Sequence, residues 1–231
     1  MEPSHHKSLA TVVVAIDGPS GSGKSSVSRG VAARLGLRYL DTGAMYRAMT
    51  WWMLRHGVDV TDAGQIAAAC GKPNLESGTD PDQPKITVDG EDVSAPIRTR
   101  EVTNAVSAVS AVPEVRARLV AMQREIIGSG GIVVEGRDIG TVVAPEAPVK
   151  IFLTASTEAR AWRRNAELAP DQATSVAVTR AEIVRRDRLD SSRATSPLAM
   201  ADDAYELDTT DLTLEQVIDR VVALVHERTC A

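Results

Sequence analysis

The chain has 231 residues, of which 43% are hydrophobic, 25% are charged and 3% are aromatic, and its formal net charge is −5. This length suits one α/β domain with small insertions, and the slightly acidic balance argues against a surface for long nucleic acids. No run reaches the roughly 18 apolar residues that a membrane-spanning helix needs, and residues 1–10 lack the apolar centre of a signal peptide. We therefore expect a cytoplasmic protein that binds neither nucleic acid nor a membrane.

Strand and helix patterns alternate from the start of the chain. Residues 11–16 (TVVVAI) form a β-branched run that ends in Asp-Gly-Pro, which predicts a buried parallel strand. Residues 24–35 place apolar side chains at helical spacing and stop at a glycine, so we expect a helix. An extended piece at 39–40 leads into a loop at 41–43, and residues 44–56 again predict a helix.

The next segment, residues 71–96, changes character because it is polar and rich in Pro, Asp and Gly. It contains two alternating runs joined by Asp89-Gly90, which is a β-hairpin signal. A hairpin surrounded by helices predicts an inserted subdomain. Residues 98–127 then predict helical structure that is broken at Pro113.

Strands and helices continue to alternate in the second half. We expect strands at 132–135, 149–154 and 205–208, arginine-rich helices at 156–168 and 173–189 around a polar link at 169–174, and an amphipathic helix at 213–228. This alternation predicts a three-layer α/β fold in which helices flank a parallel sheet. Ligands bind such sheets beyond the carboxyl ends of the strands, so segments 17–25, 41–47 and 135–140 should gather along one rim.

The cysteines and paired histidines give no sign of a metal site. Cys70 and Cys230 lack the spacing of zinc ligands, which indicates ordinary reduced thiols. His5 and His6 form too short a run to predict metal binding.

One motif carries clear chemistry. Residues Gly18–Ser25 (GPSGSGKS) match the P-loop pattern G-x-x-x-x-G-K-[ST] and lie between an expected strand and an expected helix. Backbone N–H groups and the start of the helix bind phosphates in such a loop, with Lys24 on the β- and γ-phosphates and the Ser25 hydroxyl on Mg²⁺. The residues expected to bind a nucleoside triphosphate are Gly18, Pro19, Ser20, Gly21, Ser22, Gly23, Lys24 and Ser25.

Two absences narrow the class of P-loop protein. The N-K-x-D tetrapeptide with which GTPases read guanine does not occur in the chain. Motor ATPases carry a strand that ends in an acidic pair, whereas the strand at 132–135 continues as Glu-Gly-Arg-Asp. The sequence therefore favours a small-molecule kinase.

Charged residues at other strand ends could bind the acceptor. Arg47 lies one turn into a helix that starts near Thr42, a good arrangement for gripping an anion; the alternative is a surface arginine with an N-capping threonine. Arg137 and Asp138 follow a strand and could bind substrate or form a structural ion pair in the turn.

A third cluster lies in the arginine-rich helices. Arg186, Asp190 and Arg193 recur at spacings of four and three residues, so we expect them on one helical face. Arg163 and Arg164 belong to the preceding helix. Such residues suit a lid that neutralises a transferred phosphoryl group, although charge runs are more often solvated faces.

Taken together, these segments resemble the bacterial cytidylate kinases. The matching motifs run in order from about Val12 to Leu198: IDGPSGSGKSS, LDTGAMYR, IRTREVTNAVSAVSAVPEVR, EGRDIGTVV, APVKIFLTAS and RRDRLDSSRATSPL. The combination of DTGAMYR with GRDIGTVV separates this family from adenylate, thymidylate and shikimate kinases. Its bacterial members also carry an insertion in the monophosphate-binding region, which agrees with the hairpin segment.

The resemblance implies one domain at 10–231 with three parts. These are a core at about 10–41, 130–158 and 195–231, a monophosphate-binding region with its insert at about 42–125, and a helical lid at about 159–190. It further implies a monomer that transfers a phosphoryl group in line from ATP to CMP or dCMP with Mg²⁺. A kinase for another nucleoside monophosphate is the runner-up, and a nucleotide-binding regulatory module without turnover is the alternative from another class.

The resemblance also assigns roles to residues, and the P-loop with the next residue, Gly18 to Ser26, would hold ATP. Thr42, Ser107, Arg116 and Asp138 would surround the cytosine; Arg47, Arg137 and Arg193 would hold the acceptor phosphate; Arg186 and Asp190 would contact the ribose; and Lys24, Asp138, Arg163 and Arg193 would form the catalytic set, with Arg163 and Arg164 in the lid. Chemistry agrees with this assignment, because the amine of cytosine needs an acceptor such as a carboxylate, which would repel the carbonyl of uracil. No general base is required, since the accepting phosphate oxygen is already ionised.

Overall fold

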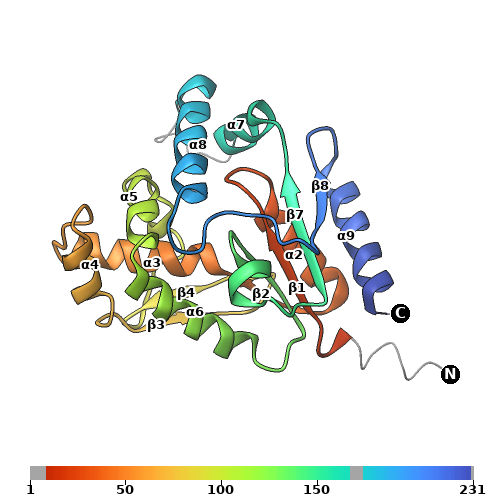
Figure 1. Ribbon diagram of the computed structural model, residues 1–231, viewed down its shortest axis with the longest axis horizontal. Helices are drawn as coiled ribbons and strands as arrows, with labels where there is room; N and C mark the ends of the chain where they lie inside the picture. The colour runs from red at the N-terminus through yellow and green to blue at the C-terminus, as the bar shows by residue number, and fades with distance from the viewer. Residues whose placement is uncertain (1–8, 167–173, 230–231) are drawn as a thin grey trace.

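The computed structural model describes residues 9–166 and 174–229 (Figure 1). His5, His6, Cys230 and most of the polar link expected at 169–174 lie outside the described residues. Within the described part, no helix combines the length and the apolar character needed to cross a bilayer.

A five-stranded parallel sheet forms the centre of the molecule. Its strands are β1 (Val13–Asp17), β2 (Arg38–Asp41), β6 (Ile132–Gly136), β7 (Val149–Thr154) and β8 (Tyr205–Asp208), in the order β2-β6-β1-β7-β8. The expected parallel α/β fold is thus confirmed. The strands β2 and β6 lie on one side of β1, and the later strands β7 and β8 lie on its other side. Open sheets bind ligands where the strand order reverses in this way, beyond the carboxyl ends of the strands.

Helices cover both faces of the sheet because successive strand residues point to opposite sides. In β1, Val14 and Ile16 pack with helices α2 (Lys24–Leu35) and α9 (Leu214–Thr229). Ala15 faces the opposite cluster. That cluster includes buried residues of α3 (Thr42–Arg55), α5 (Arg100–Ser110) and α6 (Pro113–Ile127).

The inserted segment contains the expected hairpin, formed by β4 (Ile86–Val88) and β5 (Glu91–Asp92), and a further strand, β3 (Leu75–Ser77), makes it a small antiparallel sheet. Asp89 and Gly90 form the turn with φ values of 52° and 83°, the left-handed pair that a two-residue hairpin requires. Asp89 also accepts a hydrogen bond from Trp52 Nε1 over 2.9 Å, which ties the hairpin to α3.

The arginine-rich helices pack together above the carboxyl ends of the strands (Figure 1). They are α7 (Thr157–Ala166) and α8 (Val176–Ser191). Because α8 ends at Ser191, Arg193 lies beyond it. The expectation that Arg193 shares a helical face with Arg186 and Asp190 is therefore wrong.

Other boundaries differ from the expectation for local reasons. The expected loop at 41–43 is largely the start of α3, since Asp41 caps the helix by accepting a hydrogen bond from the Ala44 N–H. The expected break at Pro113 is confirmed, since α5 ends at Ser110 and Pro113 opens α6, where its missing N–H costs nothing. Four short elements of the described chain were not expected: strand β3, helix α4 (Ala63–Ala69), a 3-10 turn at Pro96–Arg98 and a π-helical turn at Ile139–Val143.

Candidate active site

The P-loop, Gly18–Ser25, joins β1 to α2 and fits tightly among its neighbours. Gly21 and Gly23 adopt φ values of 76° and 85°, which favour glycine. A Cβ on Gly18 would lie 2.4 Å from the carbonyl oxygen of Leu153, and one on Gly21 would lie 2.9 Å from that of Arg160. Since no side chain caps the start of α2, its first N–H groups stay available for an anion.

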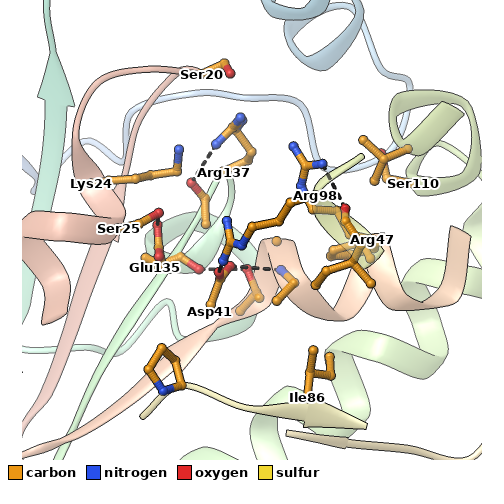
Figure 2. A pocket seen from close by; sticks show the side chains of 18 of the residues that line it. Ser20, Lys24, Ser25, Asp41, Arg47, Ile86, Arg98, Ser110, Glu135 and Arg137 are labelled. Atoms are coloured by element: carbon orange, nitrogen blue, oxygen red, sulfur yellow. Dashed lines mark hydrogen bonds and ion pairs between the residues drawn. The ribbon is translucent and has the colours of Figure 1, made fainter. Parts of the chain in front are cut away.

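A cleft of about 440 Å³ runs from this loop toward α3 and the inserted sheet (Figure 2). Its walls contain most of the residues that the sequence singled out: Ser20, Gly21, Gly23, Lys24, Ser25, Ser26, Thr42, Arg47, Arg116, Arg137, Asp138, Arg186, Asp190 and Arg193. The other expected residues, namely Gly18, Pro19, Ser22, Ser107 and Arg163, do not line this cleft. The expected rim of strand ends is therefore one continuous cleft.

Lys24 and Arg137 point into the same space beside the loop (Figure 2). Lys24 Nζ donates a hydrogen bond to the carbonyl of Pro19 over 3.3 Å. Burial and the charge of Arg137 lower the pKa of Lys24 to about 7. An anion placed between these two cations would reverse that shift.

Glu135 is a site residue that the sequence reasoning missed. It ends β6, is buried, and accepts hydrogen bonds from Ser25 Oγ over 2.9 Å and from the hydroxyl of Tyr39. Burial and the charge of Asp41 raise its pKa to about 7. The available signal is an acidic residue at the end of a predicted strand, which we assign from the sequence only to the turn that follows.

Ser25 and Glu135 offer the kinds of oxygen that Mg²⁺ prefers. Within the described ranges, no group of three or more His, Cys, Asp and Glu side chains could hold a metal by itself. Mg²⁺ commonly binds through one or two protein ligands together with substrate phosphates. One hydroxyl beside one buried carboxylate fits that pattern.

Asp138 and Arg116 form a buried ion pair at the far side of the cleft. The side chain of Arg116 is 3% exposed and that of Asp138 is 5% exposed. Arg116 also donates to the carbonyl of Ser110 over 3.2 Å and lies 5.2 Å from the centre of the Tyr46 ring. This arrangement holds a carboxylate and a guanidinium at fixed positions where a polar ring could meet both.

Arg137 and Asp138 do not pair with each other, so the structural ion pair considered from the sequence is absent. Arg137 instead donates to Asp190 and to the carbonyl of Gly18, both over 3.0 Å. Asp190 also accepts a hydrogen bond from Ser107 Oγ over 3.3 Å. Burial raises the pKa of Asp190, but the charges of Arg137, Arg186 and Arg193 outweigh it, so the net pKa lies below its usual value.

Thr42 and Arg47 both lie in the wall of the cleft. The Thr42 hydroxyl donates to the carbonyl of Glu135 over 2.7 Å, so it is not the N-cap considered from the sequence. Arg47 donates to Thr103 Oγ1 over 2.8 Å. Burial and then the charges of Arg186 and Arg164 place its pKa well below the usual value. These mutually repelling cations favour an anionic ligand.

The two lid arginines point to different places. Arg163 donates to Thr209 Oγ1 over 2.9 Å and to the carbonyl of Thr209 over 2.5 Å, which places it at the loop between β8 and α9. Arg164 lies in the cleft wall. The inserted sheet also contributes to the cleft through Ser77, Lys85 and Ile86, for which the sequence held no signal.

Comparison with known proteins agrees with the resemblance seen in the motifs. The family model for cytidylate kinase matches residues 14–227. The chain is 62% identical over 233 residues to a cytidylate kinase of Streptomyces avermitilis, covering 100% of both chains. It is 57% identical to a cytidylate kinase of Rhodococcus jostii, covering 97% of this chain and 99% of the relative.

A solved structure supports the fold alone. An uncharacterized protein from Eubacterium ventriosum superposes with a TM-score of 0.51 at 10% identity, covering 94% of this chain and 99% of that one. Identity that low shows shared architecture and no shared activity. The family match spans nearly the whole chain and the relatives are similar over their full length, so the chain belongs to the cytidylate kinase family.

Proposed function

We propose that this protein transfers the γ-phosphoryl group of ATP to CMP or dCMP, giving ADP and CDP or dCDP. The observation that carries the proposal is that the P-loop and the buried Arg116–Asp138 pair line the same cleft. One end suits a triphosphate and the other suits a polar base, and the relatives named above are cytidylate kinases.

On the donor side, the backbone of Gly18–Ser26 would hold the phosphates of ATP, with Lys24 on the β- and γ-phosphates. Ser25 would hold Mg²⁺ and Glu135 would support it through the hydrogen bond between them. Bound Mg²⁺ would neutralise phosphate charge and help to align the two nucleotides. Arg163 and Arg164 would add positive charge from the lid.

On the acceptor side, Asp138 would accept a hydrogen bond from the cytosine amine while Arg116 donates to the ring. Thr42 would complete the base site, and Ser107, which does not line the cleft, would act through Asp190. A buried carboxylate left facing the carbonyl of uracil would go unpaired, which costs enough free energy to discriminate strongly.

The remaining charged residues would hold the sugar and the acceptor phosphate. Arg186 and Asp190 would contact the ribose, and Arg47, Arg137 and Arg193 would grip the phosphate. With both phosphates fixed in line, the reaction needs positioning and charge neutralisation rather than a base. The catalytic set of this proposal is Lys24, Asp138, Arg163 and Arg193, of which Arg163 would have to leave its hydrogen bonds to Thr209 to reach the phosphates.

The division of the chain follows the same proposal. The core would be 10–41, 130–158 and 195–231, the monophosphate-binding region 42–125 and the lid 159–190. We also propose a monomer that works in the cytoplasm, where it meets only small-molecule nucleotides. Sedimentation with and without nucleotides tests the monomer.

A coupled assay for ADP with CMP, dCMP, UMP and AMP as acceptors tests the function. We expect turnover that depends on CMP or dCMP and is much weaker with UMP and AMP. Equal rates with AMP would contradict the cytosine assignment. Tight ATP binding without any monophosphate-dependent turnover would favour a regulatory nucleotide-binding module instead.

A further inference from the structure

An ion pair between a buried arginine and a partly buried aspartate, outside the proposed substrate contacts, joins the two lid helices. Arg160 on α7 and Asp187 on α8 lie 2.5 Å apart between Nη1 and Oδ2. The Arg160 side chain is 8% exposed, and its Nε donates to the carbonyl of Ala155 over 3.1 Å. Removing one partner of a buried ion pair costs more free energy than removing one partner of a surface pair.

The same pair holds the tip of the P-loop. Arg160 Nη1 donates to the carbonyl of Ser20 over 3.1 Å, and Asp187 Oδ1 accepts from the Ser20 N–H over 3.4 Å. The neighbouring Gly21 lies against the backbone of Arg160, so closely that an added Cβ would come within 2.9 Å of its carbonyl oxygen. Both backbone polar groups of Ser20 are thus bound by the lid helices.

Two cleft arginines lie close to this contact along the two lid helices. Arg164 lies one helical turn after Arg160 on α7, and Arg186 immediately precedes Asp187 on α8. Both line the cleft beside the P-loop. The Arg160–Asp187 pair fixes the P-loop relative to the lid helices. It would therefore also fix the distance between these guanidinium groups and the phosphates of bound nucleotides.

We propose that Asp187 is a positioning residue, which acts through Arg160 and Ser20 to hold the P-loop tip in register with the lid arginines during phosphoryl transfer. The inference rests on the proposed kinase function. It assigns Asp187 no contact with substrate. Loss of the pair should chiefly lower kcat, because misplaced arginines neutralise the transition state less well while the distant base site is unchanged.

The chain offers a matched control. Glu158 and Arg180 also join α7 to α8, at 3.0 Å, but both are largely exposed and neither touches the P-loop. If the lid helices merely needed an ion pair for their own stability, removing either pair would have similar effects. If the hold on Ser20 matters, only the Arg160–Asp187 pair will affect turnover.

The test measures kcat, the KM values for ATP and CMP, and the melting temperature for Asp187→Asn, Arg160→Lys, their double variant and Glu158→Gln. We expect kcat to fall about tenfold in each single variant at Arg160 or Asp187, with the KM for CMP within twofold of wild type. The kcat of the double variant should fall little further than that of a single variant, because both changes break the same ion pair. Glu158→Gln should keep the wild-type kcat.

Three outcomes would overturn the inference. These are a kcat within twofold of wild type in both single variants, an equal loss in Glu158→Gln, or a loss that the fraction of unfolded protein accounts for. CMP-dependent turnover of the wild-type protein tests the proposed function separately, since the inference concerns only the ratio of variant to wild-type rates.

Discussion

The Ser25 hydroxyl donates a hydrogen bond to Glu135 over 2.9 Å and so joins the first turn of α2 to the end of β6. Tyr39 donates to the other oxygen of the same carboxylate. Both carboxylate oxygens of Glu135 therefore accept a hydrogen bond. The oxygen that accepts from Ser25 lies beside the hydroxyl proposed to hold Mg²⁺. This geometry makes the charge of Glu135 a testable feature.

Glu135→Gln keeps the size of the side chain and removes its charge. We expect the Mg²⁺ concentration for half-maximal activity to rise about tenfold, equivalent to about 1.4 kcal/mol of metal binding. Titrating activity with Mg²⁺ at saturating nucleotides measures this. Tyr39→Phe is the control, because it removes one hydrogen bond but leaves the charge, and should shift the Mg²⁺ curve little. An unchanged curve in Glu135→Gln would exclude a role for its charge.

Lys24 should take up a proton when ATP binds. In the protein without nucleotide, burial and the charge of Arg137 lower the pKa of Lys24 to about 7, so most of the amine is neutral at pH 8. Phosphates beside the amine favour the ammonium and raise the pKa again, so binding at pH 8 draws a proton from buffer, whereas at pH 6 the amine is already charged. Calorimetry of ATP binding in EDTA, in two buffers of different ionisation enthalpy, measures the uptake.

Lys24→Met is the reference for that experiment, because ATP and other groups titrate too. The difference in proton uptake between wild type and variant should be clear at pH 8 and vanish at pH 6. The same variant should lose about a hundredfold or more in kcat, since it removes charge from the transferring phosphoryl group. Equal uptake by both proteins at pH 8 would show that Lys24 does not change its protonation state when ATP binds.

The base preference should depend on Asp138. In Asp138→Ala we expect kcat/KM for CMP to fall about a hundredfold, or about 2.7 kcal/mol, and the value for UMP to fall less. Because alanine also leaves Arg116 without its buried partner, Asp138→Asn provides a variant of similar size. Assays with both acceptors give the CMP/UMP ratio. A ratio that stays at the wild-type value in both variants would exclude the proposed role.

The inserted hairpin should depend on Trp52 for its stability. Trp52→Phe removes the hydrogen bond to Asp89, a residue held at positive φ, and should lower the free energy of unfolding by about 1–2 kcal/mol. Trp51→Phe is the control, because its half-buried ring contacts Arg55 through a cation–π interaction instead. Urea denaturation measures both. Equal losses would mean that ring size, and not the hydrogen bond, stabilises the hairpin.

Local signals account for what the sequence predicted well. The Gly18–Ser25 loop and the 149–154 strand depend on residue types within a few positions, and the structure has both where expected. The turn at Asp89-Gly90 likewise needs only its own pair of left-handed residues.

What the sequence missed depends on residues brought together by the fold. Glu135 meets Ser25 from a position 110 residues away, and Asp187 meets Ser20 from 167 residues away. No spacing rule reaches so far. The error at Arg193 had a different origin, because α8 ends at Ser191 and the helical period stops with it.

Gly21→Ala should impair turnover through contact with the lid rather than through backbone strain alone. Gly21 has a φ of 76°, and its new Cβ would lie 2.9 Å from the Arg160 carbonyl oxygen, a backbone atom that cannot move without shifting α7. Gly36, the C-cap of α2, has a φ of 65° but nothing within 4 Å of an added Cβ. Gly36→Ala therefore carries a similar conformational cost, about 1 kcal/mol, without the contact.

We accordingly expect Gly36→Ala to lower the melting temperature by a few degrees with kcat within twofold of wild type. Gly21→Ala should lower kcat more than tenfold, because the loop and α7 must separate and the Ser20 contacts move with them. Melting curves and initial rates on the two variants measure this directly. If both lost the same activity, left-handed strain would explain the loss, and the fit of the P-loop against α7 would have no special part in turnover.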